Sequence, residues 1–167
     1  MIVTIWRHGE AGRAATDRQR TLTDNGRDDI GYGSQRFREH CEARSLPAPG
    51  LILYSEWLRT TETADLIAGA FTHARCECSP ALIPGSRVAQ VDALLAQQLE
   101  PGDGPEHLVL VSHQPLVSQL VDYYLGERGQ VAPLVPGGLA TLRLEVPAAA
   151  CATLLFSAQP PGYEVMS

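Results

Sequence analysis

Short, uninterrupted apolar segments, separated by stretches of helical periodicity, constrain the fold of this chain more than any other feature. Residues 2–6, 51–54 and 108–111 form three such segments, and each is too short for a buried helix. An unbroken apolar run is typical of a strand that is buried on both faces of a parallel sheet. Because strands alternate with helical segments over residues 1–125, the sequence predicts a three-layer α/β/α sandwich around a mainly parallel sheet.

Helices are predicted from apolar side chains at helical spacing and from residues that favour helix ends. Thr23 and Ser55 are suitable N-caps, and Pro115 suits the first position of a helix. Gly31 and Gly33 weaken the first helix, because glycine has a low helix propensity. The predicted helices cover residues 24–44, 56–71, 87–99 and 116–125.

The last part of the chain predicts a different kind of strand. Residues 139–146 and 152–158 alternate between apolar and polar side chains better than the earlier runs, as strands at an antiparallel edge do. Residues 81–83 are predicted to form a short strand or an extended edge. No repeat, low-complexity tract or linker divides the sequence, so residues 1–167 are predicted to form a single domain.

The net charge of the chain argues against polyanionic partners such as nucleic acid and anionic lipid. The chain carries a formal charge of −6 and has a sequence pI near 5.3, so it offers no global basic surface to nucleic acid or anionic lipid. An anionic substrate would have to be drawn by a local cluster of arginines. We therefore expect neither nucleic acid nor a membrane among the partners.

The cysteines are scattered along the chain and give no sign of a metal site. Cys76 and Cys78 form a Cys-x-Cys pair, but no second Cys/His pair has a matching spacing, and Cys41 and Cys151 are isolated. The N-terminus lacks a signal-peptide pattern, and no apolar run is long enough to span a membrane. We therefore predict a cytoplasmic protein with reduced thiols, no metal and no cofactor.

Arginine and histidine side chains follow three of the predicted strands, at the points where these strands end. Arg7 and His8 follow the first strand. Arg59 lies near the start of the helix after the second strand, and His113 follows the strand at residues 108–111. Ligands in open α/β sheets bind beyond the carboxyl ends of the strands. We therefore expect these two arginines and two histidines to meet in one crevice.

This combination of side chains suits a phosphoryl group. Paired guanidiniums bind phosphate through forked, charge-assisted hydrogen bonds. A histidine among cations loses its proton at a lower pH, which leaves a lone pair free to attack phosphorus. A second histidine can donate a hydrogen bond to a non-bridging oxygen in the transition state. The pattern thus predicts phosphoryl transfer.

Three segments resemble motifs of the histidine phosphatase superfamily, whose fold is that of the phosphoglycerate mutases. Residues 6–10, Trp-Arg-His-Gly-Glu, resemble its Arg-His-Gly signature. Residues 55–63 resemble its Ser-Pro-x-x-Arg-x-x-x-Thr segment, and residues 111–115 resemble its second-histidine motif. Within the superfamily, the chain resembles the small SixA-type phosphohistidine phosphatases in its length, in its loop at residues 20–26 and in the lack of a long helical insertion. This likeness extends over about the first 125 residues.

The resemblance implies a role for each of the four side chains. His8 would accept the phosphoryl group covalently and pass it to water. Arg7 and Arg59 would hold the phosphoryl oxygens, and His113 would stabilise the group during its transfer. Arg20 matches a loop arginine of the SixA type that also reaches phosphate.

Two positions leave alternatives open. Arg20 could instead pair with Asp17 or Asp24 on a solvated loop. The proline that follows the serine in the family motif is Glu56 here. A carboxylate beside an anion site repels substrate unless it turns outward, so this departure leaves the role of Glu56 undecided.

The leaving group separates the remaining hypotheses. In the superfamily that the chain resembles, mutases and phosphoesterases generally carry a glutamate that protonates the leaving oxygen. The corresponding residues here, 79–87, contain no acid. A phosphohistidine leaves as an imidazole, which needs a general acid far less than an alkoxide does. We therefore predict a phosphohistidine phosphatase whose substrate is a protein of the histidine-phosphotransfer type. The alternatives are a small-molecule phosphomonoesterase that uses Glu10 or Glu56 as its acid, and a non-catalytic phosphate- or phosphoprotein-binding module.

Overall fold

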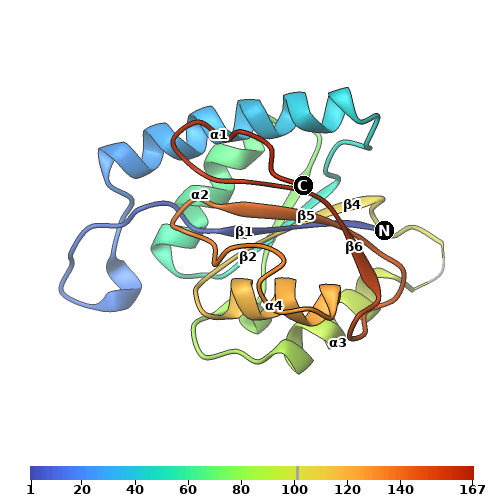
Figure 1. Cartoon of the computed structure of the whole chain (residues 1–167). Coiled ribbons are helices and arrows are strands. Elements are labelled where there is room, and N and C mark those ends of the chain that lie inside the picture. Colours follow the sequence, from blue (N-terminus) through green and yellow to red (C-terminus); the bar gives the residue numbers. More distant parts are fainter. Residues whose placement is uncertain (101) are drawn as a thin grey trace.

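The structure, a computed structural model, describes residues 1–100 and 102–167, which form a six-stranded sheet with helices on both faces (Figure 1). The strands are β1 (Ile2–Arg7), β2 (Leu51–Tyr54), β3 (Arg75–Cys78), β4 (His107–Ser112), β5 (Leu139–Leu144) and β6 (Ala152–Ala158). Their order across the sheet is β3-β2-β4-β1-β5-β6. The strands from β3 to β1 pair in parallel, whereas β5 and β6 pair antiparallel. The predicted mainly parallel sheet with an antiparallel edge is confirmed.

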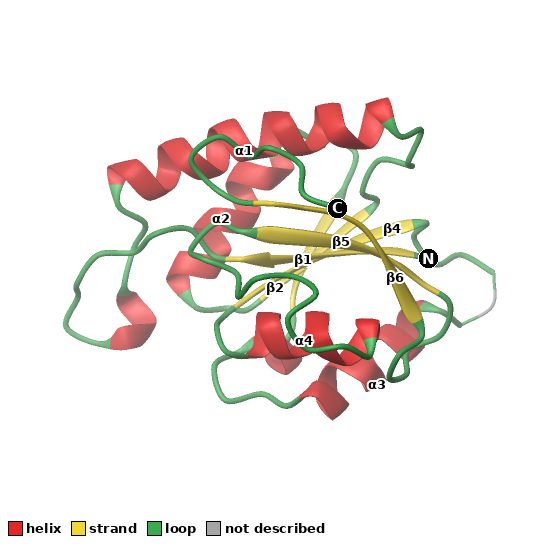
Figure 2. Cartoon of the chain, in the orientation of Figure 1, coloured by secondary structure: helices red, strands yellow, loops and turns green. Residues whose placement is uncertain are grey.

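The helices form the two outer layers of the sandwich. They are α1 (Asp24–Ala43), α2 (Leu58–Ala68), α3 (Val88–Gln98) and α4 (Leu116–Leu125), with short 3-10 helices η1 (Asp17–Gln19) and η2 (Pro80–Leu82). Figures 1 and 2 show α1 and α2 above the sheet and α3 and α4 below it. Among the described residues, no helix has both the length and the apolar character that a membrane crossing requires.

The core explains why the central strands are apolar without alternation. Leu53 and Leu110 belong to the cluster that includes α3 and α4, whereas Ile52 and Val109 belong to the cluster that includes α1 and α2. All four are buried. Because both faces of the sheet are covered, every position of a central strand gains from being apolar, at about 1.5–3 kcal/mol for each large side chain.

Helix α1 begins as predicted, and its packing explains why Gly33 stands within it. The Thr23 hydroxyl accepts a hydrogen bond from the Gly26 amide, so the N-cap is confirmed. Gly33 is buried, and a Cβ added to it would lie 2.3 Å from the ring of Tyr163. The low helix propensity of glycine, about 1 kcal/mol, is therefore accepted because the C-terminal segment packs directly on the helix backbone.

Three local predictions are wrong. Ser55 does not cap α2, because the helix begins at Leu58 after an N-cap at Trp57. Pro115 precedes α4 as its N-cap and is not its first residue. The strand predicted at residues 81–83 is instead the 3-10 helix η2, and the edge strand β3 lies just before it. All four side chains of β3 are exposed, so pairing with the backbone of β2 holds this strand and no apolar pattern marks it.

Candidate active site

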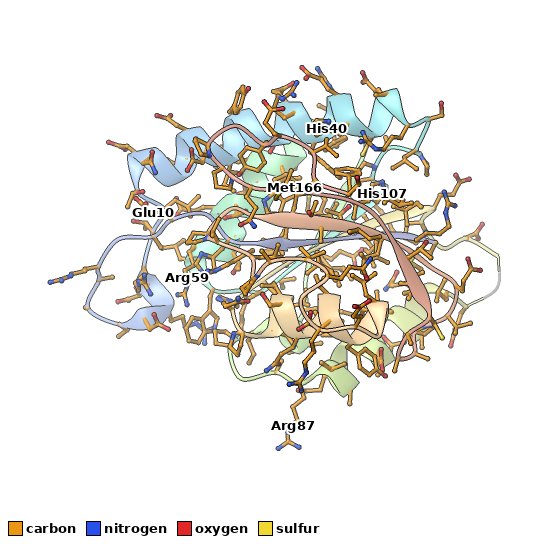
Figure 3. All side chains as sticks on the ribbon, in the orientation of Figure 1. Glu10, His40, Arg59, Arg87, His107 and Met166 are labelled. Carbon is orange, nitrogen blue, oxygen red and sulfur yellow. The ribbon has the colours of Figure 1, made fainter. Side chains whose placement is uncertain are left out.

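The four side chains predicted to form a site meet at one end of the sheet. Arg7 is the last residue of β1, His8 follows it, and His113 follows β4. Arg59 belongs to the first turn of α2, the helix after β2. All four line a cavity of about 340 Å³. Figure 3 shows Arg59 and Glu10 at this end of the molecule, beside the loop that connects β1 to α1.

Parallel strand pairing brings these residues together. Arg7 of β1 stands opposite Ser112 of β4 in the register of the sheet. His8 and His113 therefore leave neighbouring strands side by side, and the His8 amide donates a hydrogen bond to the Ser112 carbonyl at 3.1 Å. Strand β2 pairs with β4 in parallel, so both strands end at the same edge of the sheet. The chain that follows β2 therefore brings Arg59 of α2 to the edge where His8 and His113 lie.

His8 is held as a neutral ring with one nitrogen free for chemistry. Its Nδ1 lies 2.7 Å from the Gly9 carbonyl oxygen. Because a carbonyl can only accept, Nδ1 carries the proton, and Nε2 accepts from the Arg59 Nε–H at 3.2 Å. Burial, reinforced by the charges of Arg59, Arg7 and Arg20, lowers the pKa of His8 from 6.5 to about 4, against the raising effect of the Gly9 hydrogen bond. The Nε2 lone pair is therefore available at neutral pH.

His113 lies opposite His8 and is 2% exposed. The two ring centroids are 5.3 Å apart. The Nε2 of His113 is hydrogen-bonded to the Ser55 hydroxyl at 2.8 Å, while its buried Nδ1 has no partner within the described part of the chain. Burial is the main cause that lowers the pKa of His113 to about 3, and electrostatic interactions with His8 and Arg59 lower it further. This ring is also neutral at physiological pH.

Backbone carbonyls anchor both Arg7 and Arg59. Arg59 is 5% exposed, and its Nη1 donates to the Asp17 carbonyl at 2.8 Å while its Nη2 lies 3.4 Å from the Asp17 carboxylate. Arg7 donates from Nη1 to the Leu134 carbonyl at 2.9 Å. Burial lowers the pKa of both guanidiniums, yet arginine remains charged in proteins. The anchors thus aim two fixed positive charges at the cavity.

Arg20 lies at the cavity wall and pairs with one of its two predicted partners. It lines the same cavity as Arg59, and it also forms an ion pair with Asp17 at 3.0 Å. Its Nε donates to the Gly12 carbonyl at 2.8 Å. Asp24, the other predicted partner, is instead the first residue of α1.

Asp17, predicted from the sequence only as a partner of Arg20, also lines the cavity. Its carboxylate reaches both Arg20 and Arg59. The hydrogen bond from Arg20 is the main cause that lowers the pKa of Asp17, so an ionised carboxylate already occupies part of the cationic cluster. The one sequence signal was an acid three positions before Arg20, which is also common on solvated loops.

The two glutamates considered as general acids lie in different places. Glu56 is half-exposed and pairs with Arg18 at 3.0 Å, and it is absent from the described residues that line the cavity. Glu10 does line the cavity, and its carboxylate accepts from the Thr23 hydroxyl at 2.8 Å. Glu10 and Asp17 are thus the carboxylates at the cavity wall. Across residues 1–100 and 102–167, no cluster of three or more His, Cys, Asp or Glu side chains has a metal-binding arrangement.

The lowered pKa of His8 predicts an acid limb in the pH dependence. The ring is expected to titrate near pH 4, and kcat/KM should fall below that pH because a protonated Nε2 has no lone pair. The same shift contributes stability above the unfolded pKa of 6.5, and this contribution is lost as the pH falls through about 4. NMR titration of the His8 ring, assigned by its loss in His8→Asn, checks the value. A midpoint near 6.5 would contradict the burial argument.

Comparisons with known proteins agree on one group of relatives. No family model matches the chain. A phosphohistidine phosphatase SixA homolog of Haemophilus influenzae is 28% identical over 147 residues, which cover 85% of this chain and 87% of the relative. The solved structure of the protein histidine phosphatase SixA complexed with tungstate is 26% identical, with a TM-score of 0.77, and the match covers 98% of this chain and 100% of that chain.

The fold is shared more widely. A mycobacterial glucosyl-3-phosphoglycerate phosphatase matches with a TM-score of 0.68 at 16% identity, over 92% of this chain and 97% of that chain. The fold is thus shared with such phosphatases. In this chain, arginine and histidine side chains gather at one cavity of that fold. In sequence and in fold the chain is similar to the SixA-type phosphatases of the histidine phosphatase superfamily.

Proposed function

We propose that this protein removes phosphoryl groups from phosphohistidine on a protein, through a covalent phosphohistidine intermediate on His8. The observation that carries the proposal is the Nε2 of a neutral, buried His8 at a cavity lined by Arg7, Arg59 and His113. A lone pair surrounded by phosphate-binding donors suits nucleophilic attack on phosphorus.

The transfer has two steps. In the first, the lone pair on Nε2 of His8 forms a bond to phosphorus, the substrate P–N bond breaks, and its electron pair stays on the leaving imidazole. Throughout, Nδ1 of His8 keeps the proton that it donates to Gly9. In the second, the oxygen of a water molecule forms a bond to phosphorus, the P–N bond to His8 breaks, and its electron pair returns to Nε2. Inorganic phosphate leaves, and the two protons of the water are shared between phosphate and solvent.

The arginines must exchange partners when the phosphoryl group arrives. Without substrate, Arg59 donates hydrogen bonds to His8 and Asp17. The hydrogen bond to Nε2 of His8, at 3.2 Å, has to break before this nitrogen can attack phosphorus. A phosphoryl group with its three non-bridging oxygens offers stronger acceptors for the same N–H groups. Binding of substrate therefore frees the nucleophile and forms the clamp in the same rearrangement.

The lowered pKa of Asp17 and the lack of an acid in residues 79–87 favour a leaving group that needs no proton. Asp17 has a pKa below its usual range, so at neutral pH it has no proton to donate. Residues 79–87, where the superfamily resemblance implies a glutamate, contribute Pro84 to the cavity wall and contain no acid. These two facts support phosphohistidine over an alkyl phosphate, because an alkoxide leaves poorly without a general acid.

We expect the rate to depend steeply on the leaving group. Phosphohistidine protein and activated aryl phosphates should react, whereas phosphoserine and sugar phosphates should react poorly, since the arginines act on the phosphoryl oxygens of all of them alike. The measurement is kcat/KM across phosphate monoesters of graded leaving-group pKa, alongside a phosphorylated histidine-phosphotransfer protein.

A second candidate, a small-molecule phosphomonoesterase, is favoured by the position of Glu10 at the cavity wall. It predicts a flat dependence on leaving-group pKa, together with a large loss of activity in Glu10→Gln. Glu56→Gln is the matched control, because Glu56 pairs with Arg18 away from the cavity. Flat behaviour with a Glu10→Gln loss would reject the phosphohistidine proposal in favour of this one.

A further inference from the structure

Ser55 makes an unexpected contact for a residue just before a helix. Its side chain is fully buried, and in the described part of the chain its hydroxyl has two hydrogen-bond neighbours. The Trp57 amide approaches the oxygen at 3.4 Å, and Nε2 of His113 lies at 2.8 Å. The shorter of the two hydrogen bonds therefore joins Ser55 to the second histidine of the site, 58 positions away in the sequence.

The direction of these hydrogen bonds follows from what each group can do. A backbone amide can only donate, so Trp57 uses a lone pair of the Ser55 oxygen and leaves the hydroxyl proton free. The acceptor within reach of that proton is Nε2 of His113. Nε2 then has the lone pair, and the ring proton of neutral His113 lies on Nδ1.

The opposite tautomer is unfavourable at both ends of the ring. With the proton on Nε2, the buried Ser55 hydroxyl proton would have no acceptor, which is costly inside a protein. Nδ1 would then carry a lone pair, and it could not donate to an anion in the cavity that His113 lines. With the proton on Nδ1, the nitrogen that lacks a partner among the described residues is instead a donor ready for a phosphoryl oxygen.

We propose that Ser55 is a positioning residue that holds His113 in the Nδ1–H tautomer. The two histidines of the site then have fixed and complementary roles. The carbonyl of Gly9 keeps the proton of His8 on Nδ1, so His8 offers a lone pair from Nε2. The hydroxyl of Ser55 keeps Nε2 of His113 as an acceptor, so His113 offers a proton from Nδ1. The catalytic consequence rests on the proposed function, but the tautomer does not.

The tautomer can be measured directly in the unliganded protein. With ¹⁵N-labelled histidine, NMR distinguishes a protonated ring nitrogen from an unprotonated one, and His113→Gln assigns the signals. We expect Nδ1–H for His113 in the parent protein, and a mixture or the Nε2–H form in Ser55→Ala. Ser55→Thr keeps a hydroxyl and should keep the parent tautomer. His113 found as Nε2–H in the parent, or as unchanged Nδ1–H in a folded Ser55→Ala, would overturn the proposal.

Kinetics provide the second readout. Loss of the partner that orients a metal-bound histidine costs about 10- to 100-fold, and we expect a loss of similar size in Ser55→Ala. The loss should fall on kcat more than on KM because Nδ1–H acts on the developing charge. Ser34→Ala is the matched control, since it removes another buried hydroxyl, bonded to the Ile30 carbonyl at 2.7 Å on α1. Ser34→Ala should keep the parent rate and the parent His113 tautomer. Equal loss in Ser34→Ala and Ser55→Ala would mean that Ser55 contributes only to packing, and would overturn the kinetic part of the proposal.

The two proposals fail in different ways. If the protein does not turn over phosphohistidine, the ¹⁵N spectra still report whether Ser55 sets the tautomer of His113. If Ser55→Ala does not fold, the spectrum of the parent protein and that of Ser55→Thr decide the assignment.

Discussion

His8→Ala should abolish turnover, with a loss on the order of 10⁴–10⁶ in kcat/KM, as for the removal of other covalent nucleophiles. No other described side chain places a neutral nucleophile between Arg59 and His113 at the cavity. The fold should survive, because the ring packs at the cavity and outside the two apolar clusters. The rate is to be measured with a phosphohistidine protein, with the fold checked by circular dichroism.

Trapping of the phosphoenzyme tests the same assignment of His8 in a second way. The parent protein should form an acid-labile, base-stable phosphoryl adduct that His8→Ala lacks. His40→Ala is the matched control, because His40 is also a buried histidine but bonds the Tyr163 carbonyl at 2.9 Å, away from the cavity. A folded His8→Ala protein that turns over phosphate near the parent rate would show that the nucleophile has been assigned wrongly.

Arg59→Lys should lose about 10²–10³ in rate, the usual cost of removing one transition-state donor. The substitution keeps the charge but loses the planar fork. One ammonium cannot replace a guanidinium that reaches His8 through Nε and Asp17 through Nη1 and Nη2. Arg59→Lys should therefore resemble Arg59→Ala in kcat/KM measurements.

Arg18→Lys is the control for this substitution. Arg18 is an exposed arginine of η1 that pairs with Glu56, so its replacement should change the rate by no more than a few-fold. If Arg59→Lys were equally mild, Arg59 would act as a diffuse charge and the proposed clamp would be incorrect.

The sequence alone was sufficient to predict that two arginines and two histidines lie together at one edge of the sheet. The apolar runs within β1, β2 and β4 mark parallel strands, and parallel strands end at the same edge of a sheet. Arg7, His8, Arg59 and His113 therefore had to lie near one another once the class of fold was known. The Thr23 N-cap was equally predictable, because a capping hydroxyl bonds an amide only three residues away.

The tertiary structure alone decided the features that depend on partners far along the chain. β3 has exposed side chains and is held by the backbone of β2, so its sequence carries no periodic signal. Ser55 was predicted as a helix cap from its local position, yet its hydroxyl bonds His113, and Asp17 became part of the cavity through Arg59, 42 positions away. Local patterns report what a residue does within its own element. A hydrogen bond between two elements depends on where the sheet places them, and this is why the contact of Ser55 with His113 and that of Asp17 with Arg59 emerged only from the fold.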